Sequence, residues 1–330
     1  MPLNPTPPNP TPYSSEYNSL CVGVGGVYVP AMESMDDKGR YGPLAALVFG
    51  ALCISLAPVY VKWIGMDRMG PTVIAFWRTL FGAATLFLIA LLRGKTLSIP
   101  RRLIKFAVLA GFVFCCDLSS WHRSVFYAGA GMSTILANTQ VFGSAILSWF
   151  FFKERLSWKF FAAAVSAILG VVLLVGVLSD DVVFTTRYFH GVTLGLFAGL
   201  CYASYIITLK AASHRERIPD VVAFMGWVAL SCAFFLGLAS LIVGETMMPP
   251  DTSSWLLLIA LGITAQALGW WAITSALAKI DASRAGLILL LQPTLAMIWG
   301  IIFFAEQLSI VQVLGAAITL AAIYYGGVKK

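Results

Sequence analysis

Two ionisable residues lie deep within apolar segments of this chain. Arg78 lies six residues into a run that begins near residue 72, and Asp117 lies 14 residues into a run that begins near residue 103. If both runs are helices that cross a membrane in opposite directions, Arg78 lies ~9 Å from the outer face and Asp117 lies ~21 Å from the inner face. In a hydrocarbon core of ~30 Å the two side chains are then at a similar depth. A charge at that depth costs about 2.5 to 3.5 kcal/mol and therefore needs a partner, water or a function. We interpret Arg78 and Asp117 either as a fixed ion pair or as groups that line a solute path, with Asp117 as a candidate proton carrier.

Amide side chains form a second candidate set. Gln140 and Gln292 each lie nine or ten residues into an apolar run, ~14 to 15 Å deep, and Asn138 lies close to the first of them. Pro293 removes a helix hydrogen bond beside Gln292, so we expect a helix break there, and Pro58 predicts another. These amides are expected to bind a solute near the midplane or, alternatively, to bond to each other between helices.

Aromatic residues can wall the same space. Trp270 is deep enough to line a cavity with Gln266, Tyr202 and Tyr205, although packing alone is an equal alternative for Trp270. Nearer the membrane surface we expect Trp121 in the interfacial belt, Arg123 extended to the surface, and Glu154 and Glu306 at helix ends, where they fix loop contacts.

The elements that must position these groups are apolar runs long enough to cross ~30 Å of hydrocarbon as helices. Turn signals such as Gly70-Pro71 and Pro249-Pro250 separate them. Ten spans are predicted, at 43–63, 72–92, 103–125, 130–152, 158–178, 191–210, 221–244, 254–276, 283–304 and 310–327. The N-terminal tail, the even-numbered loops and the C-terminus carry 17 Lys and Arg residues against three in the odd-numbered loops, so both termini are expected in the cytoplasm.

The chain contains one five-span unit twice. A first block of residues recurs 148 positions later and a second block 152 positions later; the matches include Lys62 with Lys210, Gln140 with Gln292, Phe152 with Phe304 and Glu154 with Glu306. Because each unit has an odd number of spans, the second copy must enter the membrane from the opposite face. The charge bias of equivalent loops also reverses, since the loop at 93–105 is basic and its partner at 245–253 has no Lys or Arg.

We therefore predict an all-α integral membrane protein of ten transmembrane helices arranged as two inverted five-helix repeats, at 43–178 and 191–327. Residues 1–42 are predicted to be a disordered tail, because they hold seven of the 15 prolines; translation from Met32 or Met35 is an alternative start. The proline breaks are not expected to be paired, since Pro58 matches Ile206 and Pro293 matches Val141.

Composition excludes several other classes of protein. Hydrophobic residues make up 59% of the 330 and charged residues 11%, and mean hydropathy is +0.85. The net charge of +7 is explained by topology rather than by nucleic acid, because the basic residues lie between apolar runs. No metal-ligand spacing and no hydrolase or nucleotide motif is present, so we expect no enzyme, no cofactor and no metal.

The pattern resembles the EamA-type branch of the drug/metabolite transporter superfamily. The resemblance rests on the two five-helix units, on Arg78, and on the helix ends Glu154-Arg155-Leu156-Ser157 and Glu306-Gln307-Leu308-Ser309. It implies a multi-pass inner-membrane protein that moves small organic solutes such as amino acids, with export as the favoured direction. Its expected partners are the lipid bilayer, a small solute and, as an open alternative to uniport, protons; monomer and homodimer both stay open.

The sequence leads to one main hypothesis and two alternatives. The main hypothesis is a secondary transporter whose halves alternate around a midplane cavity. A membrane enzyme acting on lipid would need converging acidic residues or histidines at one face, and the sequence offers no such cluster. In a scaffold or sensor that does not transport, Gln140 and Gln292 would only pack.

Overall fold

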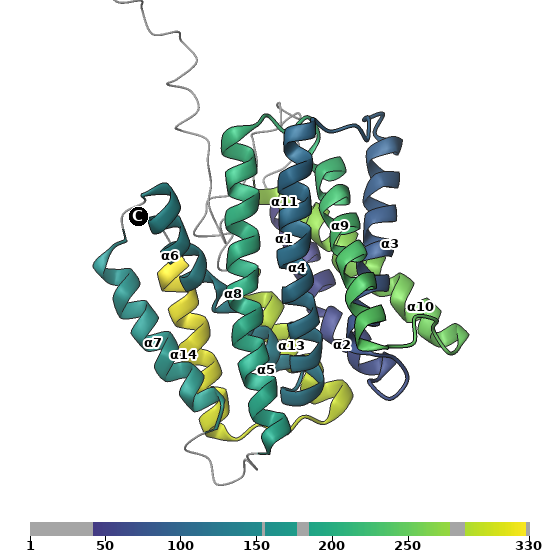
Figure 1. Ribbon diagram of the computed structural model, residues 1–330. Helices are drawn as coiled ribbons and strands as arrows, with labels where there is room; N and C mark the ends of the chain where they lie inside the picture. Colours follow the sequence, from purple (N-terminus) through teal and green to yellow (C-terminus); the bar gives the residue numbers. More distant parts are fainter. Residues whose placement is uncertain (1–41, 154–155, 177–184, 278–287, 328–330) are drawn as a thin grey trace, which may run out of the picture.

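The computed structural model describes residues 42–153, 156–176, 185–277 and 288–327, so the tail expected at 1–42 lies almost wholly outside the described residues, as does Glu154. The regular structure of these ranges is helical (Figure 1). The helices are α1 (Gly42–Ser55), α2 (Ala57–Ile64), α3 (Pro71–Leu92), α4 (Arg101–Ala128), α5 (Ala130–Asn138), α6 (Gln140–Phe152), α7 (Trp158–Leu174), α8 (Thr186–Arg215), α9 (Val221–Val243), α10 (Thr252–Leu261), the π-helix η2 (Gly262–Gly269), α11 (Trp270–Leu277), α13 (Leu291–Phe304) and α14 (Ile310–Gly327).

Most of these helices are long and apolar enough to span a bilayer. Among the described residues, seven continuous or nearly continuous helices meet that standard, and α7, α13 and α14 are shorter apolar helices at the remaining three predicted positions. Large apolar side chains such as Leu92, Phe234 and Ile242 remain exposed on the outside of the bundle, as lipid-facing residues do.

The helices of the two repeats contact each other in the reciprocal pattern of a two-fold axis. Equivalent spans pair across the bundle: α3 contacts α9, α7 contacts α14, and α5, the first half of the fourth span of its repeat, contacts α13, the second half of the fourth span of the other. The first helix of each repeat also packs on the third helix of the other, α1 on α11 and α8 on α4, and Figure 1 shows α4 and α8 side by side. Residues that are equivalent in sequence therefore make equivalent contacts, as an inverted repeat requires.

Two lysines show the same relation at atomic detail. The Lys62 ammonium lies 4.3 Å from the ring centroid of Phe304, and the Lys210 ammonium lies 4.6 Å from that of Phe152. These are the equivalent residues of the two copies, exchanged between repeats. Lys62 lies at the end of the bundle that carries Glu245 and Glu306, here called the glutamate end. Lys210 lies toward the opposite, basic end, which carries Arg93 and Arg102.

Helices are interrupted in both repeats. The first span ends at Ser55 and resumes at Ala57, next to Pro58, while the equivalent helix α8 runs without a break. The fourth span breaks at Thr139, where the backbone bonds from Thr139 N–H to Leu136 and from Phe142 N–H to Thr139 tighten to i→i−3 spacing. In the second repeat α13 begins at Leu291 after a turn at Leu290.

Unpaired proline breaks had been expected, and for the fourth span of each repeat that expectation is wrong. Thr139 and Leu290 occupy matching positions to within one residue, although only the second repeat has a nearby proline. Pro293 is the third residue of α13 and lies in its first turn, where a missing N–H is tolerated. It does not interrupt the interior of the helix. Gln140 is thus the first residue of α6, and Gln292 is the second residue of α13.

Candidate functional site

The centre of the bundle holds a cluster of polar and aromatic residues from both repeats. Arg78 on α3 is only 5% exposed, and its Nε–H donates to Oε1 of Gln266 on η2 at 3.1 Å. Asp117 on α4 is also buried and interacts electrostatically with Arg78 without forming a direct ion pair. Nη1 of Arg78 has no hydrogen-bond partner among the described residues. The cluster therefore holds a buried cation whose donor capacity is not used up by the described residues.

Aromatic rings wall this cluster on the side of the second repeat. Tyr202 on α8 lies 6.1 Å from Trp270, edge to face, and 6.0 Å from Tyr205, stacked. Tyr205 in turn stacks on Phe114 of α4 at 4.7 Å. The structure thus brings together five of the predicted residues, here named the central cluster: Arg78, Asp117, Gln266, Tyr202 and Trp270. Tyr205 borders it.

Local backbone structure explains how Gln266 reaches Arg78. The span that begins at Thr252 changes from α to π geometry between Gly262 and Gly269, and Gln266 lies in the middle of that segment. π segments are rare and are frequently found at functional sites. Gly82 on α3 allows the close approach. A Cβ at this position would lie 2.3 Å from Cγ and 2.7 Å from Cβ of Gln266, so any larger residue would collide with Gln266.

Trp121 corrects one of the sequence expectations. It was expected in the interfacial belt, but its side chain is only 8% exposed and its ring lies 5.6 Å from the guanidinium carbon of Arg78. The depth estimate from the sequence placed it at the edge of the span, whereas α4 extends to Ala128, which moves Trp121 inward. Residues that face Arg78 from α4 therefore include an aromatic ring as well as Asp117.

The predicted amides lie apart from this hydrogen bond. Gln140 is buried at the start of α6 and its Oε1 has no partner among the described residues. Gln292 is half-buried, and no hydrogen bond joins the two, although both are described. Asn138 donates to the carbonyl of Thr134 within its own helix at 2.8 Å. Gln140 thus remains a candidate contact, while Asn138 uses one amide N–H within its own helix.

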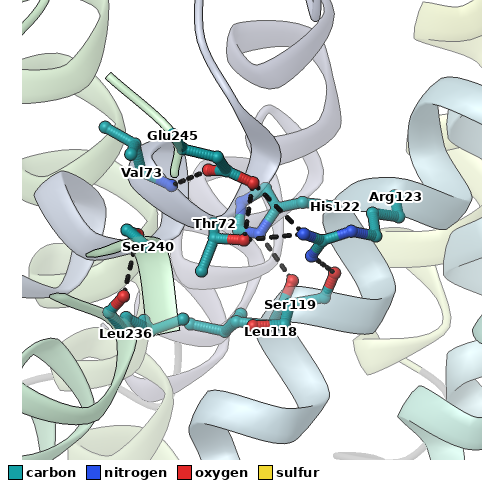
Figure 2. A network of polar contacts seen from close by, with 9 residues as sticks. All are labelled: Thr72, Val73, Leu118, Ser119, His122, Arg123, Leu236, Ser240 and Glu245. Carbon is teal, nitrogen blue, oxygen red and sulfur yellow. Dashed lines mark hydrogen bonds and ion pairs between the residues drawn. The ribbon is translucent and has the colours of Figure 1, made fainter. Parts of the chain in front are cut away.

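A second polar site, at the glutamate end, fastens the two repeats together through Glu245 (Figure 2). Glu245 follows α9, and its Oε2 accepts from the N–H of Val73, in the first turn of α3, at 2.9 Å. Its Oε1 accepts from Thr72 Oγ1 at 2.9 Å and from Arg123 Nη2 at 3.2 Å. Arg123 also donates to Thr72 Oγ1 at 2.8 Å and to the carbonyl of Ser119 at 2.9 Å. Arg123 does not extend to the surface as expected, since it is held by this Glu245 network.

Replacing Glu245 with alanine is expected to lower thermal stability more than any single change of an exposed ion pair at this end. The substitution leaves the partly buried N–H of Val73 without its acceptor and removes the carboxylate that pairs with Arg123, which keeps only its neutral acceptors on Thr72 and Ser119. A lost charge-assisted hydrogen bond costs about 1.5 to 3 kcal/mol. Thermal unfolding of the purified protein in detergent measures this, with Arg68→Ala as control; equal shifts for the two variants would contradict the account.

Glu306 forms a parallel network from the end of α13. Its Oε1 accepts from Lys62 Nζ at 2.6 Å and from the N–H of Ala130, the first residue of α5, at 2.9 Å. The carboxylate lies against Gly129 and Gly300, where a Cβ would meet it. Each glutamate comes from the second repeat and binds the positive N-terminus of a first-repeat helix together with a basic side chain. The sequence identified Glu306 as a helix-end residue but gave no signal of its partner.

Arg68 and Asp251 make a third, weaker contact at the same end. Their closest atoms are 3.5 Å apart and the side chains are 49% and 43% exposed, so solvent screens the pair. The N–H of Ser254, and to a lesser degree Arg68, lowers the pKa of Asp251 below its ordinary value. Asp251 therefore acts mainly as the N-cap of α10.

The described residues contain no group of three or more His, Cys, Asp and Glu side chains that could hold a metal ion. What the fold offers is a bundle of spans built from two inverted repeats, a buried polar cluster between them, and ion pairs that join the repeats at one end. These features define a multi-pass membrane transporter.

Comparison with known proteins gives the family. The model of the EamA-like transporter family matches residues 42–176 and 189–325, so this chain belongs to that family, with two copies of its domain. A probable amino-acid metabolite efflux pump of Escherichia coli is 28% identical over 298 residues, which is 86% of this chain and 93% of that protein. An uncharacterized transporter of Archaeoglobus fulgidus is 24% identical, over 86% of this chain and 95% of the other.

Solved structures show the same fold. One crystal structure superposes with a TM-score of 0.62 at 19% identity, covering 87% of this chain and 96% of that one.

Among the sequence relatives, the biotin transporter of Escherichia coli is 25% identical over 41% of this chain and 44% of that protein. The relatives thus differ in the solutes that their names give.

Proposed function

We propose that this protein is a secondary transporter that exports small organic metabolites such as amino acids across the inner membrane, with both termini in the cytoplasm. The amino-acid assignment is supported by the name of the Escherichia coli efflux pump, and the orientation by the Lys and Arg bias of the loops. By that orientation the glutamate end faces outward.

The observation that carries the proposal is the buried guanidinium of Arg78. A cation in the hydrocarbon region is costly, and a permanent structural arginine is expected to have its donors satisfied. Arg78 instead uses Nε on a neutral amide and keeps Nη1 without a partner among the described residues. A guanidinium with spare donors suits a carboxylate, and the rings of Tyr202 and Trp270 suit an apolar side chain. Gln140 and Gln292 at the helix breaks are proposed as further contacts.

Alternating access is the mechanism that the inverted repeats favour. The Glu245 and Glu306 networks hold the repeats together at the glutamate end, and opening of that end requires both to separate. Asp117, beside Arg78, is proposed as the proton-binding group if transport is proton-coupled. Solute flux measured against pH in Asp117→Asn decides between coupling and uniport, because an unchanged pH profile removes Asp117 as the proton carrier.

Counterflow in proteoliposomes tests the function. Vesicles loaded with a mixture of neutral amino acids are expected to accumulate external labelled amino acid above the level of protein-free vesicles. Matched vesicles containing Arg78→Gln are expected to accumulate it at an initial rate about 100-fold lower. Failure of the wild-type protein with amino acids and with a broader metabolite extract would overturn the proposal.

A further inference from the structure

A cavity at the glutamate end is distinct from the central cluster. Its volume is about 220 Å³, which is space for a small organic molecule, and it opens beside the Glu306 network. Its lining combines polar or charged residues with apolar ones; the ones that matter here are Lys62, Glu306, Gln307, Met132, Met297 and Leu308. None of the central-cluster residues lines it.

The two charged groups of this cavity keep unused bonding capacity. Glu306 accepts both of its hydrogen bonds on Oε1, so Oε2 has no donor among the described residues. Lys62 gives one of its three N–H donors to Glu306 and makes no other hydrogen bond within the described part of the chain. Gln307, at the rim, is exposed. One acceptor and up to two donors are thus available side by side.

The chemistry of the ligand follows from this pairing. A simple anion is attracted by Lys62 but repelled by Glu306, and a simple cation meets the reverse. A zwitterion with adjacent ammonium and carboxylate groups satisfies both, because it replaces one internal ion pair with two. The remaining wall includes Met132 and Met297, whose flexible thioethers adapt to side chains of different shape.

We propose that this cavity is a second binding site, for a zwitterionic amino acid, whose ammonium binds Glu306 and whose carboxylate binds Lys62. The inference rests on the proposed function only in identifying this ligand with the transported solute. Occupation of the site draws the Lys62–Glu306 pair apart and weakens the link between α2 and the end of α13. Solute at the glutamate end then promotes opening of that end, so external solute accelerates exchange.

Protection from thiol labelling tests the site directly. The reporter is Gln307→Cys, treated with a bulky membrane-impermeant maleimide in detergent, where both ends of the protein are accessible. A mixture of alanine, threonine, leucine and methionine at ten times its Kd is expected to slow labelling about tenfold, because only about one site in eleven stays free. The analogues 4-methylpentanoate and 3-methylbutylamine, which lack the ammonium or the carboxylate, are expected to give no protection at equal concentration.

Two further variants show where protection arises. Lys62→Gln in the Gln307→Cys background keeps the size of the cavity and removes the carboxylate partner, so protection is expected to disappear. Met248→Cys, an exposed position at the same end outside the cavity, is expected to label at one rate with and without amino acids. Equal labelling of Gln307→Cys with and without the mixture, in protein that performs counterflow, overturns the second site and leaves the transporter assignment standing. Protection of Gln307→Cys in protein that performs no counterflow supports the second site and counts against the transporter assignment.

Discussion

Replacing Arg78 with glutamine is expected to reduce transport about 100-fold. The variant keeps a hydrogen-bonding side chain beside Gln266 but removes the buried charge, and a charge-assisted hydrogen bond contributes about 1.5 to 3 kcal/mol, which is roughly a factor of 10 to 150. Asp117 also loses the positive charge that acts on it. Initial rates of amino-acid efflux from proteoliposomes measure the loss.

Two control variants separate binding from folding. Arg78→Lys keeps the charge without the planar fork, so we expect a raised KM with transport still detectable. Arg68→Gln, at an exposed position, is expected to transport at the wild-type rate. If Arg78→Gln kept the wild-type KM and maximal rate and changed only thermal stability, Arg78 would be a structural residue.

Replacing Glu306 with glutamine is expected to shift the protein toward states that are open at the glutamate end. Glutamine can still accept from the N–H of Ala130, so the change removes mainly the ion pair with Lys62, whose side chains are only 21% and 16% exposed. Loss of about 1.4 kcal/mol raises the open population about tenfold. A cysteine at Val125, which is fully buried beside the cavity, is expected to react with an impermeant maleimide about tenfold faster.

The ion pair can be distinguished from general loosening by two comparisons. Asp251→Asn removes an exposed pair at the same end and is expected to leave the rate of labelling unchanged. Exchanging the charges, as Lys62→Glu with Glu306→Lys, is expected to restore closure only in part, because an ammonium would then face the N–H of Ala130. An unchanged labelling rate in Glu306→Gln would show that this ion pair does not control opening.

The sequence was most informative where the two repeats could be compared. Internal matches and reversed charge bias predicted an inverted repeat, and the contacts between the equivalent helices α3 and α9 and between α7 and α14 agree with it. The resemblance to the EamA-type family, which rests on the two five-helix units, Arg78 and the helix ends at Glu154 and Glu306, is confirmed by the family model. Because a repeated sequence imposes symmetry on the fold, comparing the two halves of one chain was sufficient to predict the inverted repeat.

Side-chain partners were harder to predict. Arg78 and Asp117 were matched by depth alone, but depth does not specify which faces of two helices meet, and the π segment brings Gln266 to Arg78 instead. The break at Thr139 has no proline to signal it. Glu245 and Arg123 are 122 positions apart and come together only through the pairing of the repeats.

Access to the native thiol of Cys201 from both sides of the membrane tests the central claim most directly. Cys201 adjoins Tyr202 and interacts electrostatically with Asp117, so a protein that keeps it as the only cysteine reports on the central cluster without a new side chain there. In a variant that still transports, a small impermeant methanethiosulfonate is expected to react with Cys201 from inside and from outside, more slowly when solute is present. Reaction from one side alone, unaffected by solute, would contradict a solute path through this cluster.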